Sequence, residues 1–185
     1  MFIQTETTPN PATIKFLPGQ EISPARSFDF KSAAEAQYAP LAKRIFGISG
    51  VAGVFYGRDF VSVTKDENTD WIMLKSLVMA ALMEHLATGQ PILTQEALAG
   101  KTTNDDDSEI VIQIKELLET RVRPAVAQDG GDIVFDRFED GVVYLRMQGA
   151  CSGCPSSTAT LKSGVENMLR HFIPEVEEVR AVPDY

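Results

Sequence analysis

The sequence predicts an α+β protein made of two small domains. In the second half, two stretches with helical spacing of apolar residues enclose a pair of alternating strands. In the first half, short strand-forming runs separated by Pro and Gly come before and between helical stretches. Residues 94–108 contain one large apolar residue, Leu98, and a run of three aspartates. We therefore expect domains at 1–92 and 109–185, joined by a flexible, polar and acidic linker at 93–108.

The first domain is expected to combine strands with two helices. The expected elements are strands at 2–7, 12–17 and 27–30, a helix at 33–46, strands at 51–56 and 60–64 forming a hairpin, and a helix at 71–88. In the last of these helices apolar residues occur nearly all round, which predicts that a broad face of it packs on a sheet.

The second domain is expected to run helix, strand, strand, helix, strand. The expected elements are a helix at 110–122, strands at 132–138 and 142–148, a helix at 161–172 and a strand at 176–182. Pro124 predicts a kink or an end in the first helix, and Gly130-Gly131 stops the chain after it. Asp140-Gly141 is typical of a tight hairpin turn, and Pro174 ends the second helix.

Composition and charge exclude several classes of partner. Hydrophobic residues make up 44% and charged residues 23% of the 185 residues, with no apolar run near the ~20 needed to span a bilayer. The net charge is −9, whereas binding to phosphate backbones needs clustered Lys and Arg. We expect neither membrane nor nucleic acid as a partner. The first residues resemble no secretory or organellar leader, which predicts a cytoplasmic protein or a matured organellar one.

The most informative feature is the pair Cys151 and Cys154, the only cysteines in the chain. They are three positions apart, between an expected strand and an expected helix. Gly153 can adopt a positive φ that turns the second thiol toward the first, and Pro155 sets the start of the helix. The N-terminal end of a helix favours the thiolate, the form that binds metal or attacks a disulfide. We therefore expect Cys151 and Cys154 to be the metal- and cofactor-binding residues.

Two thiols cannot complete such a site, because a Cys₄ zinc site or a thiolate-held iron–sulfur cluster needs four sulfurs. A second copy of the chain, related by a two-fold axis beside the loop, would supply the other two. The metal would then bridge a homodimer and would be easier to release than one enclosed by a single chain. Since neither half shows an unmistakable exposed apolar seam, dimerisation is expected to depend on the metal.

Three functions are compatible with the pair. A thiol-disulfide redox protein of the thioredoxin type needs a parallel βαβ framework, whereas the strand before the motif belongs to a hairpin, and Pro155 follows the cysteines rather than separating them. A zinc-bridged interaction module satisfies the ligand count but leaves the linker and the first domain unexplained. An iron–sulfur cluster shared by two chains satisfies the count equally well and provides a role as a carrier.

Enzymatic catalysis is not expected, and we assign no catalytic residues. His85 and His171 are far apart in the sequence, and no Gly-x-Ser-x-Gly motif is present. His85 is in line with apolar residues of its helix, which favours a place in or beside the core. His171 suits the C-terminal end of the last helix, where a positive charge is favoured.

Three segments carry a resemblance that covers essentially the whole chain. They are residues 149–157 (Gly-Ala-Cys-Ser-Gly-Cys-Pro-Ser-Ser), 124–132 (Pro-Ala-Val-Ala-Gln-Asp-Gly-Gly-Asp) and 8–16 (Thr-Pro-Asn-Pro-Ala-Thr-Ile-Lys-Phe). The first two resemble the C-terminal domain, and the third the N-terminal domain, of two-domain members of the NifU-like (Nfu) family. The resemblance implies an iron–sulfur scaffold or carrier that holds a [4Fe-4S] cluster between two chains through Cys151 and Cys154. It also implies upstream cluster-assembly proteins as donors and apo iron–sulfur proteins as acceptors. A [2Fe-2S] cluster and Zn remain alternatives.

Overall fold

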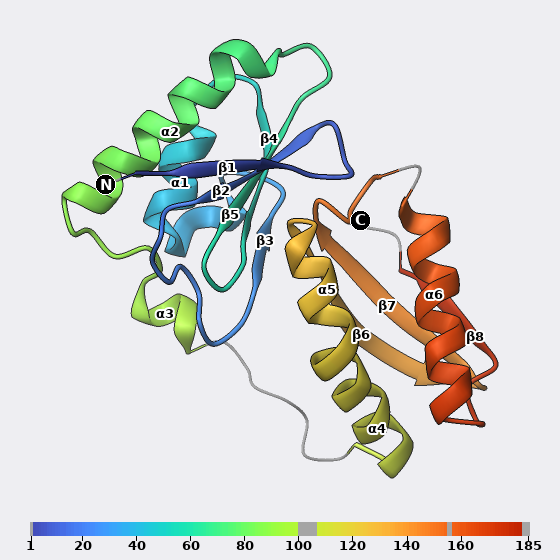
Figure 1. Ribbon diagram of the computed structural model, residues 1–185. Coiled ribbons are helices and arrows are strands. Elements are labelled where there is room, and N and C mark those ends of the chain that lie inside the picture. Colours follow the sequence, from blue (N-terminus) through green and yellow to red (C-terminus); the bar gives the residue numbers. More distant parts are fainter. Residues whose placement is uncertain (1, 100–106, 155–156, 183–185) are drawn as a thin grey trace. The chain divides into compact units, whose positions relative to one another are not determined.

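The computed structural model describes residues 2–99, 107–154 and 157–182 (Figure 1). The chain divides into two compact units, Met1–Lys101 and Thr102–Tyr185. Each unit has its own sheet, its own helices and its own buried apolar core. The α+β class predicted from the sequence is therefore confirmed.

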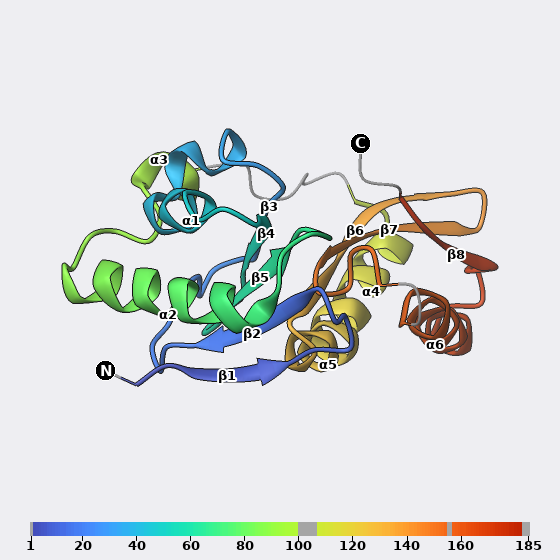
Figure 2. The ribbon, with the colours of Figure 1, turned by 90° about the horizontal axis from the view of Figure 1, so that it is seen from above.

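The first unit is built on a five-stranded antiparallel sheet with the strand order β1-β2-β5-β4-β3. Its strands are β1 (Gln4–Thr7), β2 (Thr13–Leu17), β3 (Phe28–Phe30), β4 (Val51–Tyr56) and β5 (Val61–Lys65). Helices α1 (Pro40–Phe46) and α2 (Trp71–Ala87) lie beside each other and share one core with the sheet (Figure 2). Each strand expected in this half is present, within two residues at either end.

The helix expected at 33–46 is broken in two. A 3-10 turn, η1 (Glu35–Tyr38), is followed by Ala39 with φ −126° and ψ 82°, and α1 begins at Pro40. Proline suits the first turn of a helix but disfavours a helical conformation in the residue before it. The local chemistry of Pro40 therefore overrides the continuous apolar pattern.

Helix α2 packs through a narrower face than the sequence predicts. The Asp70 side chain caps it by accepting a hydrogen bond from the backbone N–H of Ile72 at 2.8 Å. Its buried residues are Leu74, Val78, Leu82 and His85. Ile72, Met73 and Leu77 are 81%, 72% and 50% exposed, so apolar side chains of α2 outside this face are open to solvent. Across the described ranges, no helix is both long and apolar enough to cross a membrane.

The segment expected to begin the linker differs from that expectation. Residues 95–98 form a helical turn, α3 (Gln95–Leu98), within the first unit. The Thr94 N–H donates to the carbonyl of Tyr38 at 2.9 Å, and the Arg26 guanidinium donates to the carbonyl of Ala97. The segment takes part in these contacts through its backbone groups, so its polar composition does not reveal them. The rest of the expected linker includes residues 100–106, which lie outside the described residues.

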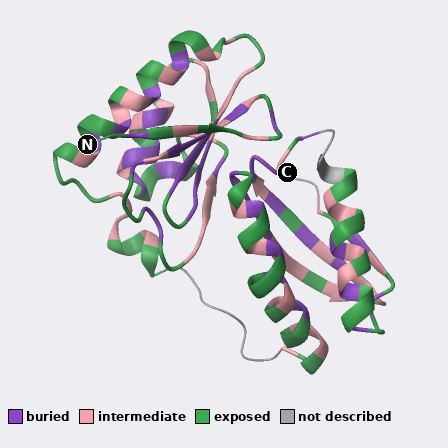
Figure 3. Cartoon of the chain, viewed as in Figure 1, coloured by how far each residue is buried: buried purple, intermediate pink, exposed green. Residues whose placement is uncertain are grey.

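The second unit has the order of elements that the sequence predicts. Its elements are α4 (Glu109–Leu117), a π-helical turn η2 (Leu118–Val122), α5 (Arg123–Gln128), β6 (Gly131–Glu139), β7 (Val142–Gly149), α6 (Ser157–Phe172) and β8 (Glu178–Ala181). Buried and more exposed residues alternate along β7, which is the middle strand of the sheet (Figure 3). The helices and the sheet enclose one core.

Pro124 produces the predicted irregularity in the first helix of this unit. Proline lacks an N–H, and its ring clashes with the carbonyl four residues earlier, so α-helical hydrogen bonding cannot continue through it. The chain passes through η2 and resumes as α5 at Arg123. The extra residue in such a turn rotates the next helical segment by about 100° relative to a regular helix.

Strand β7 is at the centre of a mixed sheet, and this overturns one argument made from the sequence. It pairs antiparallel with β6 and parallel with β8, so β7, α6 and β8 form a parallel βαβ unit around the cysteine loop. A central strand has two edges, and the hairpin occupies only one of them. The absence of a parallel framework therefore no longer argues against a thioredoxin-like dithiol, whereas the place of Pro155 still does.

Candidate metal centre

The two cysteines lie in the loop between the end of β7 and the start of α6, as the sequence predicts. The loop follows the carboxyl end of a strand in a parallel crossover, a place where sheets with such crossovers commonly bind ligands. Cys151 and Cys154 are thiols rather than a disulfide. They are 5% and 1% exposed, so both thiols are shielded from solvent in the single chain.

Two glycines give the loop its shape. Gly149 and Gly153 have φ values of 62° and 70°, a region that L-residues with a side chain rarely adopt. The positive φ predicted for Gly153 is confirmed. The N–H of Ala150 donates to the carbonyl of Gly130 at 3.1 Å, which fastens the start of the loop to the residue before β6.

Gly131 lets the loop approach β6 closely. It pairs with Gly149 in the ladder between β6 and β7. A Cβ at position 131 would lie 2.5 Å from Cys151 Sγ and 2.8 Å from the carbonyl oxygen of Gln148. The sequence predicts a role for Gly130-Gly131 only in ending the helix. The available signal was a second adjacent glycine at the start of a strand.

The surroundings of Cys151 disfavour its thiolate. Burial, followed by the charges of Asp129 and Asp132 and by Cys154, raises the pKa of the Cys151 thiol to about 12. The expectation that the helix start favours the thiolate is therefore wrong for Cys151, because desolvation and two nearby carboxylates outweigh a helix dipole. Metal binding at this sulfur must release a proton.

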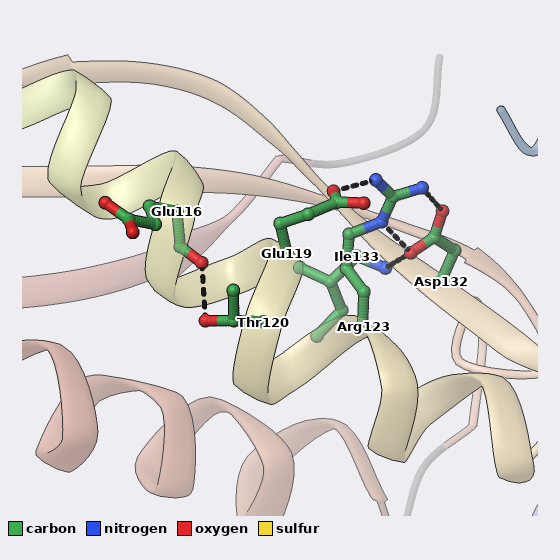
Figure 4. A network of polar contacts seen from close by, with 6 residues as sticks. All are labelled: Glu116, Glu119, Thr120, Arg123, Asp132 and Ile133. Carbon is green, nitrogen blue, oxygen red and sulfur yellow. Dashed lines mark hydrogen bonds and ion pairs between the residues drawn. The ribbon is translucent and has the colours of Figure 1, made fainter. Parts of the chain in front are cut away.

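Asp132 is held in place by Arg123 (Figure 4). Arg123 Nε donates to one carboxylate oxygen at 2.9 Å and a terminal nitrogen donates to the other at 2.8 Å. The first oxygen also accepts the N–H of Ile133 at 2.8 Å, and the carboxylate of Glu119 makes a third contact with the guanidinium. The hydrogen bonds to Asp132 raise the pKa of Arg123. From the sequence, Asp132 is interpreted only as a carboxylate near a turn, because no local pattern indicates that it pairs with Arg123.

The described residues of one chain offer no further ligand set. They contain no group of three or more His, Cys, Asp and Glu side chains placed to hold a metal. His85 is fully buried in the first unit, where Nε2 lies 3.2 Å from the Pro91 carbonyl oxygen and burial lowers its pKa. This confirms its expected core position. His171 lies at the far end of α6 from the loop, against the ring of Phe172.

Family models and known relatives agree with this arrangement. Residues 114–180 match the family model of the NifU-like domain, and residues 3–89 match that of the scaffold protein Nfu/NifU N terminal. The chain is 49% identical over its whole length to the human "NFU1 iron-sulfur cluster scaffold homolog, mitochondrial", and the match covers 73% of that relative. The chain belongs to the NifU-like (Nfu) family. The cysteine loop lies inside the matched NifU-like domain.

The chain is also similar to a plant relative and to a solved yeast structure. The Arabidopsis thaliana "NifU-like protein 4, mitochondrial" is 54% identical over 97% of this chain and 65% of that relative. A solution structure of a NifU-like protein from Saccharomyces cerevisiae is 29% identical, with a TM-score of 0.47, and covers 51% of this chain and 86% of its own. The chain spans between 62% and 73% of the length of the first curated relatives it matches.

Proposed function

We propose that this protein is an iron–sulfur cluster scaffold and carrier that holds a cluster between two copies of the chain through Cys151 and Cys154. The observation that carries the proposal is the loop itself. It presents two thiols three positions apart, while the described residues of one chain provide no group of three ligands. A thiolate-bound cluster needs four sulfurs, which a symmetric pair of chains supplies. The names of the family relatives support the same function.

The cluster is the cargo of this protein, and we propose [4Fe-4S] as its form. Two loops with two cysteines each supply four thiolates, which suit a [4Fe-4S] or a [2Fe-2S] cluster equally well, and the family resemblance favours the former. Both thiols are buried in the single chain, so they must become accessible when two chains share a cluster. The raised pKa of Cys151 means that binding competes with protonation. Such a site releases its cargo more readily than one whose thiolates are already formed.

We propose that upstream cluster-assembly proteins load this site and that apo iron–sulfur proteins receive the cluster. Transfer then proceeds by exchange of thiolates, each incoming cysteine replacing one of the bridging ligands. No bond of an organic substrate is made or broken, so the role is that of a carrier rather than an enzyme. The cytoplasmic location and the matured organellar form both stay predictions. The human and Arabidopsis thaliana relatives are named mitochondrial, and those names apply to them.

A thiol-disulfide redox function is the second candidate, because the motif lies in a parallel βαβ unit. Against it stands the chemistry of Cys151. A redox dithiol attacks as a thiolate, and reactive cysteines have lowered pKa values, whereas burial and carboxylates raise the pKa of this one. Metal binding also needs the thiolate, so the pKa by itself does not decide between the two functions. The match to the NifU-like domain and the place of Pro155 after the cysteines favour the carrier.

Anaerobic reconstitution of the full chain with iron and sulfide tests the proposal. A [4Fe-4S] cluster shared by two chains predicts about two irons and two acid-labile sulfides per chain, a brown colour, and a dimer in sedimentation that the metal-free protein does not form. Colourless protein that contains zinc and no sulfide would support a zinc bridge instead. A brown protein that sediments as a monomer would contradict the shared site.

A further inference from the structure

We propose that Arg123 is a positioning residue for the cysteine loop, acting through Asp132 on the start of β6, and that this determines how firmly the chain holds a cluster. The cluster part of the inference rests on the proposed function. Neither Arg123 nor Asp132 needs to touch the cluster. Their role depends on two connections, from α5 to β6 and from β6 to the loop, and on the turn that orients Arg123.

The first connection joins α5 to β6. Arg123 opens α5, and Asp132 is the second residue of β6. The guanidinium donates a hydrogen bond to each oxygen of the carboxylate, at 2.9 Å and 2.8 Å, and the Asp132 side chain is 6% exposed. A planar fork with two parallel donors fixes direction as well as distance, which a lysine ammonium cannot do. The pair therefore defines where the first residues of β6 lie.

The second connection joins β6 to the loop. Asp132 pairs with Gln148 and Gly131 pairs with Gly149 in the ladder, while the Gly130 carbonyl accepts the N–H of Ala150. Cys151 then packs directly over Gly131, where no side chain would fit. Since glycine leaves no side chain between the two backbones, a displacement of β6 reaches the sulfur position directly.

The π-helical turn before α5 explains why Arg123 points at β6. The π-helical turn η2 ends at Val122, immediately before Arg123. The additional residue in that turn rotates position 123 by about 100° relative to an unbroken helix. Pro124, which interrupts the helix, thus also contributes to the direction of the guanidinium.

The test uses the full chain with Arg123→Lys, which keeps the charge and loses the fork, and Asp132→Asn, which keeps the shape and loses the charge. Arg146→Lys is the matched control. Arg146 also pairs with an aspartate of the same sheet, Asp136, but its side chain is 52% exposed and lies in the middle of β7. The native chain, Arg123→Lys and the control are reconstituted anaerobically, and loss of cluster absorbance is followed after adding a chelator.

Asp132→Asn is compared by hydrogen exchange alone, because it also removes a charge that acts on the Cys151 thiol. We expect Arg123→Lys to lose the cluster about tenfold faster than the native chain, the size typical for residues that orient metal ligands. The control should lose it at the native rate. Hydrogen exchange of the metal-free proteins provides a readout that a general loss of stability does not mimic. In both variants the Ala150 amide should exchange about tenfold faster, while amides in the middle of β7 keep their native protection.

A native rate of cluster loss together with native exchange at Ala150 would overturn the inference. So would a uniform rise in exchange over the whole sheet, since that identifies a pair that only stabilises the fold. If Arg123→Lys does not fold, exchange at Ala150 in Asp132→Asn decides. If the native chain takes up no cluster, the proposed function fails, and exchange at Ala150 still decides whether Arg123 positions the loop.

Discussion

Gly131 and Cys151 are in contact across the edge between β6 and the cysteine loop. A Cβ at position 131 would lie 2.5 Å from Cys151 Sγ and 2.9 Å from the Cys151 backbone nitrogen. Neither atom can retreat far, because Cys151 is buried in the core of the second unit. Gly131 does not reverse the chain, and this contact instead makes it a determinant of where the Cys151 sulfur lies.

Gly131→Ala is expected to displace the loop. Overpacking of this kind costs about 1–3 kcal/mol, so the midpoint of thermal unfolding should fall and the iron bound after reconstitution should drop. Gly164→Ala is the matched control, since apart from its chain neighbours and the backbone of α6 itself, nothing lies within 4 Å of its Cβ position. Alanine there should stabilise the helix by about 0.5–1 kcal/mol. Native iron content in Gly131→Ala would show that the loop accommodates the methyl group.

Replacing either cysteine should abolish stable cluster binding. Cys151→Ala and Cys154→Ala each leave a dimer with two sulfurs, and iron and sulfide analysis after reconstitution should show little of either. Alanine is preferable to serine because Cys151 packs in the core and a buried hydroxyl costs about 1–3 kcal/mol when unpaired. Circular dichroism should show native secondary structure. Full retention of iron in either variant would refute the ligand assignment.

The metal-free protein should lose stability in alkaline solution through Cys151. Its thiol pKa is about 12 in the folded chain against 9.0 as the ordinary value. Above pH 9 the unfolded chain therefore releases a proton that the folded chain keeps, and stability falls by up to about 1.4 kcal/mol per pH unit. Thermal unfolding between pH 7 and 10.5 measures this. The slope should be smaller in Cys151→Ala, and equal slopes would contradict the raised pKa.

Cluster transfer separates the carrier from the redox protein. The reconstituted dimer should restore an apo-[4Fe-4S] protein faster than free iron and sulfide do, even with a chelator present, because the cluster passes directly between thiolates. The metal-free chain should show little disulfide reductase activity. If the chelator abolishes transfer while the metal-free chain reduces disulfides efficiently through Cys151, the redox function takes the place of the carrier.

The second unit should function alone. It has its own apolar core, in which residues from its helices and strands are fully buried. A fragment of residues 102–185 is therefore expected to give a cooperative unfolding transition and to bind as much iron per chain as the full protein. An unfolded fragment would mean that the second unit needs the first, and would contradict the proposed domain boundary.

Sequence patterns determined most elements, because the periodicity of a helix or a strand is local. The amphipathic spacing in α6, the Asp140-Gly141 turn and the irregularity before Pro124 each depend on a few neighbouring residues. The composition of the cysteine loop is equally local, so the candidate ligands Cys151 and Cys154 and the family resemblance were available from the sequence by itself.

Only the tertiary structure decided what surrounds those ligands. The parallel pairing of β7 with β8, the fork between Arg123 and Asp132 and the contact of Gly131 with Cys151 all join residues whose pairing no local pattern specifies. Burial is likewise a property of the assembled core, and it reverses the pKa shift expected for Cys151 from the helix start. The sequence determined which atoms are candidates to bind a cluster, whereas desolvation and packing decided how buried those thiols are and how readily they lose a proton.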